Sequence, residues 1–172
     1  MDFQTVLESR RSVRSYTGEP ISRETLERIL FAANAAPVGL GKYDSLHLTV
    51  VSSLELLEAI EENTAAVFQT SRRSFLYNAP ELVLVSTANA DNVGFSNAAI
   101  VVENMALAAV NEGVGACHIW SAAMALQKNP ELMTKLGIPE GFIPACSIVL
   151  GCSEQTYEIR QFPENRIRIN RV

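Results

Sequence analysis

The chain has 172 residues, of which 48% are hydrophobic, and it carries a formal net charge of −5. A chain of this length buries roughly two thirds of its unfolded surface on folding, so we expect one well-filled domain over residues 1–172. The acidic balance argues against a general nucleic-acid surface, which needs a broad basic face.

The predicted elements alternate between helices and strands, without repeats or a linker. Apolar residues at helical spacing predict helices over residues 2–10, 21–36, 54–62, 95–112 and 129–137. Short apolar or alternating runs predict strands over residues 46–52, 81–87, 114–120 and 143–151. The 95–112 helix is apolar almost all round, which predicts a place at the centre of the molecule or of a dimer. The final "NRIRINRV" alternates polar with apolar residues, as an edge strand does.

Neither a membrane span nor a disulfide framework is expected. Polar residues such as Glu103, Asn104 and Glu112 interrupt the longest uncharged stretches, and no apolar run follows the charges near the N-terminus. The three cysteines form no C-x-x-C pair and have apolar neighbours. We therefore expect reduced thiols in a cytoplasmic protein.

The stretch "SRRSVRSY" near the N-terminus contains three of the chain's 14 basic residues, Arg10, Arg11 and Arg14, together with Ser12. Guanidinium groups bind phosphate oxygens in bidentate fashion, and a serine hydroxyl adds a donor, so the cluster indicates a small anionic ligand. The alternative is that the arginines complement the C-terminal dipole of the preceding helix. Spacing alone leaves both interpretations open.

Other nucleotide, metal and hydrolase motifs do not fit. The run "GLGK" would need glycine at Ala36 and serine or threonine at Tyr43 to form a phosphate loop. The run "GVG" follows a predicted helix, and His118 stands where a dinucleotide fingerprint has its last glycine. The two histidines lack the neighbouring ligands of known zinc patterns, so no metal is expected. A G-x-S-x-G motif is absent as well.

Read together, the motifs resemble the nitroreductase family of FMN flavoproteins. The matching features are Arg-Arg-Ser-x-Arg-x-Tyr after a short helix, a longer helix ending in Ala-Ala-Pro, and an alanine-rich helix running into "GVGACHIW". The resemblance covers nearly the whole chain. It implies an α+β fold with a mixed central β-sheet flanked by helices and an extended C-terminal arm. It also implies a homodimer with FMN bound where the subunits meet.

The resemblance also implies roles for individual residues. Arg10, Arg11 and Ser12 match positions used on the FMN phosphate and ribityl chain, and Arg14 matches a basic position near the pyrimidine edge of the flavin. Arg166 matches a tail position that returns to the phosphate. The segment Ile119, Trp120 and Ser121 matches the one that passes the flavin, with the backbone of Trp120 near N5. A further contact falls on Arg72 or Arg73. No side-chain catalyst is expected, because the flavin itself carries the redox chemistry.

Residues 38–46 depart from the family pattern, which has a serine-rich stretch and Asn-x-Gln-Pro-Trp there, so the contacts that replace these residues are open. The resemblance implies an enzyme that passes electrons from NADH or NADPH through FMN to nitroaromatic, quinone or similar small acceptors. Alternatives are a flavin-fragmenting or dehalogenating relative, or a flavin-storage protein. The sequence sets neither the natural acceptor nor the choice between NADH and NADPH.

Overall fold

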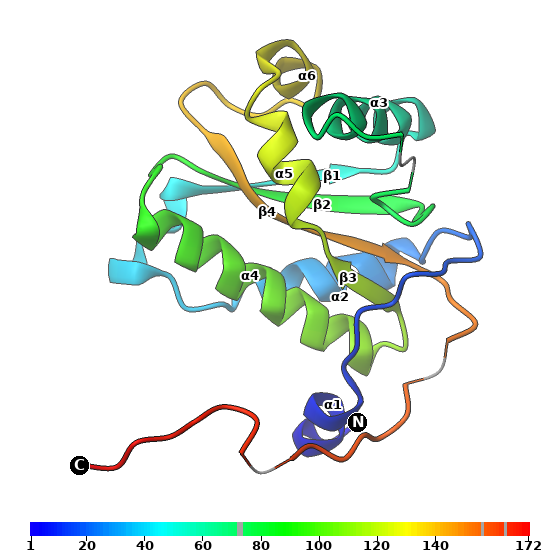
Figure 1. Ribbon diagram of the computed structural model, residues 1–172, viewed down its shortest axis with the longest axis vertical. Coiled ribbons are helices and arrows are strands. Elements are labelled where there is room, and N and C mark those ends of the chain that lie inside the picture. The colour runs from blue at the N-terminus through cyan, green and yellow to red at the C-terminus, as the bar shows by residue number, and fades with distance from the viewer. Residues whose placement is uncertain (72–73, 156, 164) are drawn as a thin grey trace.

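The computed structural model describes residues 1–71, 74–155, 157–163 and 165–172 (Figure 1). The helices are α1 (Phe3–Ser9), α2 (Arg23–Asn34), α3 (Leu54–Val67), α4 (Asn92–Asn111), α5 (Trp120–Leu126) and α6 (Pro130–Lys135). The strands are β1 (Leu46–Val51), β2 (Glu81–Thr87), β3 (Gly115–His118) and β4 (Ile143–Gly151). Two short 3-10 turns, Gly39–Gly41 and Tyr43–Ser45, precede β1.

The strands form one sheet in the order β1-β2-β4-β3, and each described neighbouring pair is antiparallel. The expected mixed sheet is therefore wrong for the described residues. The reason lies in β4, which enters between β2 and β3 and runs opposite to both. A register shift between Val85 and Ser86 breaks the β2–β4 ladder near one end.

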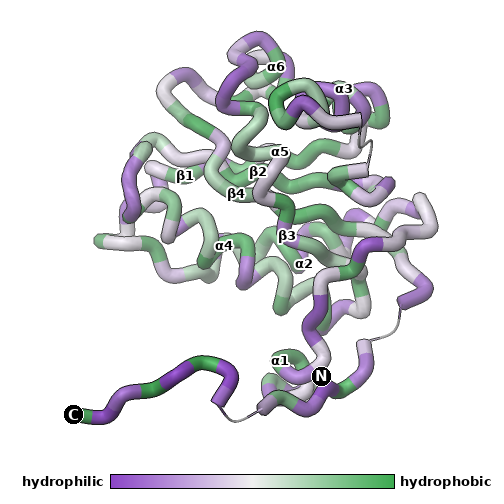
Figure 2. Tube along the Cα trace, viewed as in Figure 1, coloured by the Kyte–Doolittle hydropathy of each residue, from purple (hydrophilic) through white to green (hydrophobic). Residues whose placement is uncertain are grey.

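Helices cover both faces of this sheet (Figure 1). On β2, Val83 and Val85 face a core shared with α2 and α4, whereas Leu82 and Leu84 face a core shared with α3, α5 and α6. Every residue of β2 is buried, as its continuous apolar run "ELVLV" indicates. Figure 2 shows the most hydrophobic positions along the inner strands and α4.

The twenty-residue helix α4 is the central helix that its sequence predicts. Length and composition alone would let α4 cross a membrane, but half of its apolar stretch is buried inside the molecule. It packs against α2 and the sheet, with small residues such as Ala98, Ala106 and Ala109 in the contact. Packing therefore accounts for its composition.

Two sequence predictions fail in detail. The strand expected over residues 114–120 ends at His118, and residues 120–126 form α5, a helix that the sequence analysis missed. Residues 165–172, expected as an edge strand, pair with no strand in the part of the chain described here. This arm extends away from the body of the molecule (red in Figure 1) and leaves Ile167 and Ile169 exposed.

Candidate functional site

The arginine-rich segment of residues 10–17 lies along the edge strand β3. The Val13 amide donates to the carbonyl of Ala116 in β3 at 2.9 Å, and the Thr17 amide donates to the carbonyl of Cys152, just after β4, at 3.0 Å. These two bonds fix the segment at both ends. The side chains of residues 10–12, before the first bond, and of residues 14–16, between the two bonds, are thus held at the β3 edge of the sheet.

Tyr16 secures this arrangement from above the sheet. Its hydroxyl donates to the Val13 carbonyl at 3.0 Å. Its ring lies so close to Gly115 and Gly151 that a Cβ on either glycine would come within 3.0 Å of a ring carbon. Both positions therefore require glycine, because any side chain would push the tyrosine and the segment that carries it outward.

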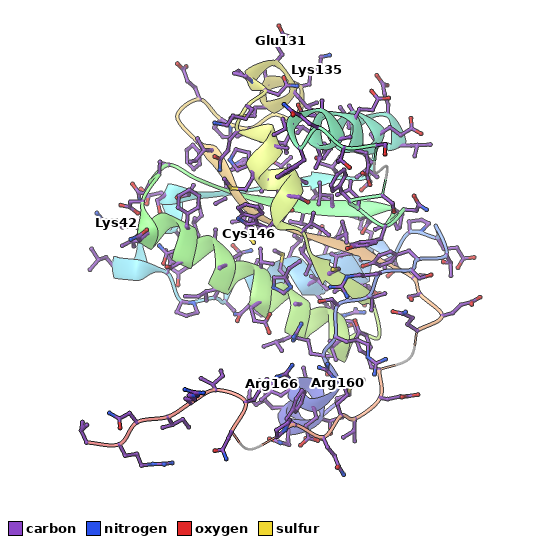
Figure 3. All side chains as sticks on the ribbon, in the orientation of Figure 1. Lys42, Glu131, Lys135, Cys146, Arg160 and Arg166 are labelled. Atoms are coloured by element: carbon purple, nitrogen blue, oxygen red, sulfur yellow. The ribbon has the colours of Figure 1, made fainter. Side chains whose placement is uncertain are left out.

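Four guanidinium groups gather where this segment meets the C-terminal region. Removal from water lowers the pKa of Arg160, and the positive charges of Arg10, Arg11 and Arg166 lower it further. Figure 3 shows Arg160 and Arg166 beside α1. Such a concentration of like charge is unfavourable by itself, and it is typical of a site for an anion.

Arg160 connects the C-terminal region to the arginine-rich segment near the N-terminus. Its backbone amide and its Nε donate to the carbonyl of Glu8 at 3.1 and 3.3 Å, and its Nη2 donates to the carbonyl of Arg10. The guanidinium groups of Arg160 and Arg166 lie 4.9 and 5.2 Å from the ring centre of Phe162. Sequence reasoning did not identify Arg160, because its contacts with Glu8 and Arg10 join segments far apart in the chain.

Arg11 carries the most direct indication of a missing partner. Its Nε is buried, yet no hydrogen-bond acceptor for it exists among the described residues. Leaving such a donor unsatisfied costs about 1–3 kcal/mol, more when the group is charged. An anionic oxygen at this place would remove that cost, and the donor set therefore fits a phosphate.

Two other polar residues of the segment, Ser12 and Arg14, contact different parts of the molecule. The Ser12 hydroxyl hydrogen-bonds the thiol of Cys117, and burial raises the pKa of that thiol. Arg14 is exposed, and its guanidinium lies 5.9 Å from the ring centre of Tyr77. Arg14 is thus set apart from the four-arginine cluster, in keeping with a separate contact.

The segment at the end of β3 is held equally firmly. Ile119 is buried, its amide donates to the Ser147 carbonyl at 2.8 Å, and its own carbonyl accepts from the Ser147 hydroxyl. Trp120 then begins α5 with 61% of its surface exposed, and Ser121 follows it, half-buried. The first amides of a helix have no acceptor within the helix, and Ile119 gives those of α5 no side-chain cap.

One carboxylate joins the cluster to this segment. Glu103 on α4 places Oε1 at 3.5 Å from the Nε of Arg10 and Oε2 at 3.2 Å from the Nε2 of His118. The hydrogen bond from His118, and the charge of Arg10 after it, hold the pKa of Glu103 below its usual value against the opposing effect of burial. Sequence reasoning did not identify Glu103, which reads as one polar residue in an apolar helix.

Within residues 38–46, the segments Gly39–Gly41 and Tyr43–Ser45 form the two 3-10 turns, and Leu46 begins β1. The Gly39 amide donates to Oδ1 of the buried Asn97 on α4 at 3.1 Å. This bond ties the turn region to the central helix. Arg72 and Arg73 lie outside the described residues.

Of the two hollows described, the larger is not lined by residues of the arginine cluster. A cavity of about 800 Å³ is lined by residues of α3 and its neighbours, and among the described residues this lining carries three carboxylates: Gly18, Pro20, Ser52, Leu54, Leu57, Glu58, Glu61, Glu62, Leu76, Asn78, Ala79 and Pro80. A hollow of about 530 Å³ between α1 and the C-terminal region includes Arg160 and Phe162 in its lining. Of these two hollows, the second adjoins the arginine cluster through Arg160.

A protein-family comparison matches residues 7–152 to the nitroreductase family. The chain belongs to the nitroreductase family. A nitroreductase from Bacteroides fragilis, solved with bound FMN, is 27% identical and superposes with a TM-score of 0.83 over 99% of this chain and 100% of its own. A nitroreductase with bound FMN from Desulfitobacterium hafniense is 25% identical, with a TM-score of 0.85 over 100% of this chain and 99% of its own.

Sequence relatives agree with the structural ones. A Methanothermobacter thermautotrophicus protein, whose name proposes NADH dehydrogenase or NAD(P)H nitroreductase activity, is 28% identical over 99% of this chain and 88% of its own length. An NADPH-flavin oxidoreductase from Vibrio harveyi is 26% identical over 92% of this chain and 68% of its own length. The expected family, its α+β fold and its class of oxidoreductase enzymes are thereby confirmed.

Proposed function

We propose that this nitroreductase-family chain is an FMN-dependent oxidoreductase, which takes electrons from NADH or NADPH and passes them to nitroaromatic, quinone or similar small acceptors. The observation that carries the proposal is the four-arginine cluster with the buried Nε of Arg11, which has no acceptor among the described residues. Support comes from the relatives solved with FMN and from the NADPH-flavin oxidoreductase among the sequence relatives.

In this proposal the arginine cluster binds the phosphate. Arg10, Arg11 and Arg166 supply charged donors, and Ser12 adds a hydroxyl toward the ribityl chain. We add Arg160 to these residues, since it holds the carbonyls of Glu8 and Arg10 in place. A cluster that draws its members from both ends of the chain recognises the phosphate only in the folded protein.

At the other end of the site, the chain orients the flavin ring. Arg14 would supply positive charge at the pyrimidine edge, and Ile119, Trp120 and Ser121 would run past the ring with a backbone donor near N5. Arg72 stays a prediction. When bound, the flavin supplies the redox chemistry, with hydride entering and leaving at N5. The protein's part is therefore binding, orientation and placement of charge.

No thiol chemistry is assigned to this site. Burial raises the pKa values of Cys117 and Cys146, which keeps both in the neutral, weakly nucleophilic form. Replacement of either by alanine should change stability while flavin turnover continues.

We propose that the protein acts as a homodimer. Large apolar side chains are exposed on three segments. Val93 and Ile100 are exposed on α4, and Trp120 is exposed at the start of α5. The C-terminal arm exposes Ile167 and Ile169. Obligate interfaces of this apolar kind bury upwards of about 2,000 Å². We further propose one FMN-binding domain over residues 1–172 in a cytoplasmic protein, with neither nucleic acid nor membrane as a partner.

Purification and anaerobic reduction test the function. The protein should be yellow, with flavin absorbance that bleaches within seconds to minutes when NADH or NADPH is added and returns when a quinone or nitroaromatic follows. A yellow protein that neither nicotinamide bleaches would point to a storage role. A colourless protein that takes up no added FMN would contradict the proposal altogether.

A further inference from the structure

Glu103 is shared by two partners that titrate differently. Its two carboxylate oxygens face Arg10 and His118 separately, at 3.5 and 3.2 Å. Arginine stays charged at every physiological pH, whereas histidine as a residue type changes charge between pH 5 and 8. The charge that Glu103 can offer to Arg10 therefore depends on the protonation of His118.

Within one chain, the side chains of Arg10, Glu103 and His118 are all partly exposed. Their exposed fractions are 32% for Arg10, 45% for Glu103 and 33% for His118. The charges of Arg10, Arg11 and Arg166 act on Arg160, and those of Arg14 and Arg10 act on the thiol of Cys117, which precedes His118 on β3. The charges of Arg10 and Arg11 also act on the hydroxyl of Tyr157. Glu103 is the one carboxylate that pairs with a member of this cluster in the described residues.

We propose that Glu103 and His118 are positioning residues that make phosphate binding by Arg10 depend on pH. This inference rests on the proposed function. With His118 protonated, Glu103 is matched by the imidazolium, and the Arg10 guanidinium is available to the FMN phosphate. With His118 neutral, Glu103 draws Arg10 toward α4 and offsets part of its charge.

The expected effect is moderate, since the pairs are partly exposed. An ion pair of this kind corresponds to about a two- to fivefold change in the FMN Kd. Phosphate monoesters themselves lose charge near pH 6, which weakens binding on acidification in every variant alike. The informative quantity is therefore the ratio of Kd values between a histidine variant and its parent at the same pH.

The experiment is a fluorescence titration of FMN with apo-protein between pH 5.5 and 8.5. Four proteins are compared: wild type, His118→Asn, Glu103→Gln and the double variant, with riboflavin as the ligand that lacks a phosphate. His118→Gln replaces His118→Asn if the latter does not show a cooperative melt. The Kd ratio of His118→Asn to wild type should be about one at pH 8.5 and rise about two- to fivefold at pH 5.5.

The double variant decides whether Glu103 carries the effect. In the Glu103→Gln background, the histidine substitution should change the FMN Kd by the same small factor at all pH values, and riboflavin should show no pH-dependent ratio. A ratio that does not change with pH in wild type, or that changes equally without Glu103, overturns the inference while FMN binding stands. Failure of wild type to bind FMN at any pH would overturn the proposed function, and this inference with it.

Discussion

The arginine cluster and the cavity beside α3 differ in both shape and charge. The cavity is the larger of the two hollows described, at about 800 Å³, and among the described residues its ionisable lining consists of Glu58, Glu61 and Glu62. The cluster adjoins a shallower hollow and holds four guanidinium groups, one of them with a buried nitrogen that has no partner in the described residues. The proposed phosphate site is the arginine cluster rather than the larger cavity, because the cluster combines gathered guanidinium groups with a buried donor that has no partner among the described residues.

The two regions also differ in how they are held. Glu61 uses both carboxylate oxygens to accept the amides of Phe75 and Leu76, at 2.8 and 2.6 Å, so this acid serves the local structure. In the cluster, the backbone bonds of Val13 and Arg160 fix the segments, and the buried Nε of Arg11 is left without an acceptor among the described residues. The following predictions test this contrast, beginning with the largest expected effect.

Substitution of Arg10 should weaken FMN binding strongly. Arg10→Ala removes a charge-assisted contact of about 1.5–3 kcal/mol, which corresponds to a roughly 10- to 150-fold higher FMN Kd. Riboflavin should bind the variant about as well as it binds wild type. Arg23→Ala, at the exposed start of α2, is the matched control and should leave both affinities unchanged. Equal loss of FMN and riboflavin would show that Arg10 supports the fold rather than the phosphate.

The substitution Gly151→Ala should disturb the packing of Tyr16, which holds the arginine-rich segment against the sheet. The added Cβ would lie 2.5 Å from Cδ of Pro80 and 3.0 Å from the Tyr16 ring, and the proline ring has little freedom to move. We expect a loss of about 1–3 kcal/mol in the free energy of unfolding, measured by urea denaturation. Gly39→Ala is the control, because its Cβ would meet its nearest neighbour at 3.4 Å, an ordinary contact. Equal stability of the two variants would contradict the packing described for Tyr16.

Acid should remove a small stabilising contribution of Glu103. Its pKa is lowered in the folded protein, so the folded state favours the charged form. The contribution is fully present above the unfolded pKa of about 4.3 and is lost as pH falls through the lower folded value. Because the pair is exposed to solvent, its size stays below about 1 kcal/mol. Between pH 6 and pH 3, apo Glu103→Gln should lose less stability than apo wild type, and a greater loss would contradict this assignment.

The smallest effect is expected from the acidic cavity. Glu58 and Glu62 line the larger hollow and do not belong to the arginine cluster, so we consider the variants Glu58→Gln and Glu62→Gln. Each should change the FMN Kd by less than about twofold, since neither carboxylate pairs with an arginine of the cluster in the described residues and solvent-exposed charges interact weakly. A tenfold change in FMN affinity would move the candidate site to the cavity and reverse the comparison.

Much of the fold was predictable because its signals are local. Periodicity located β1, β2, β4 and the helices α1 to α4, and Asn129 caps α6 through its side chain. The helix α5 was missed because Ile119 gives no side-chain cap and an apolar run continues from β3 into the helix. The alternation in the arm predicts two faces but does not specify a strand partner. The antiparallel insertion of β4 depends on long-range pairing that no local pattern encodes.

The site was predictable only where a motif carried it. The resemblance pointed to Arg10, Arg11, Ser12 and Arg166, and the structure brings the three arginines together. Arg160 and Glu103 were missed, because their roles arise from distances between segments far apart in the chain. A guanidinium in an extended tail and a carboxylate in an apolar helix are each common features. Their meaning appears only when the fold places both beside Arg10.

The most direct test of the phosphate site is the ratio of riboflavin to FMN Kd values for wild-type protein, measured by fluorescence titration at pH 7. The two ligands share the ring and the ribityl chain and differ in the phosphate alone. Two or more charge-assisted contacts of about 1.5–3 kcal/mol each predict that FMN binds roughly 100-fold or more tightly than riboflavin. The ratio should also fall steeply in Arg10→Ala. Equal affinities of wild type for FMN and riboflavin would contradict the assignment of the arginine cluster to a phosphate.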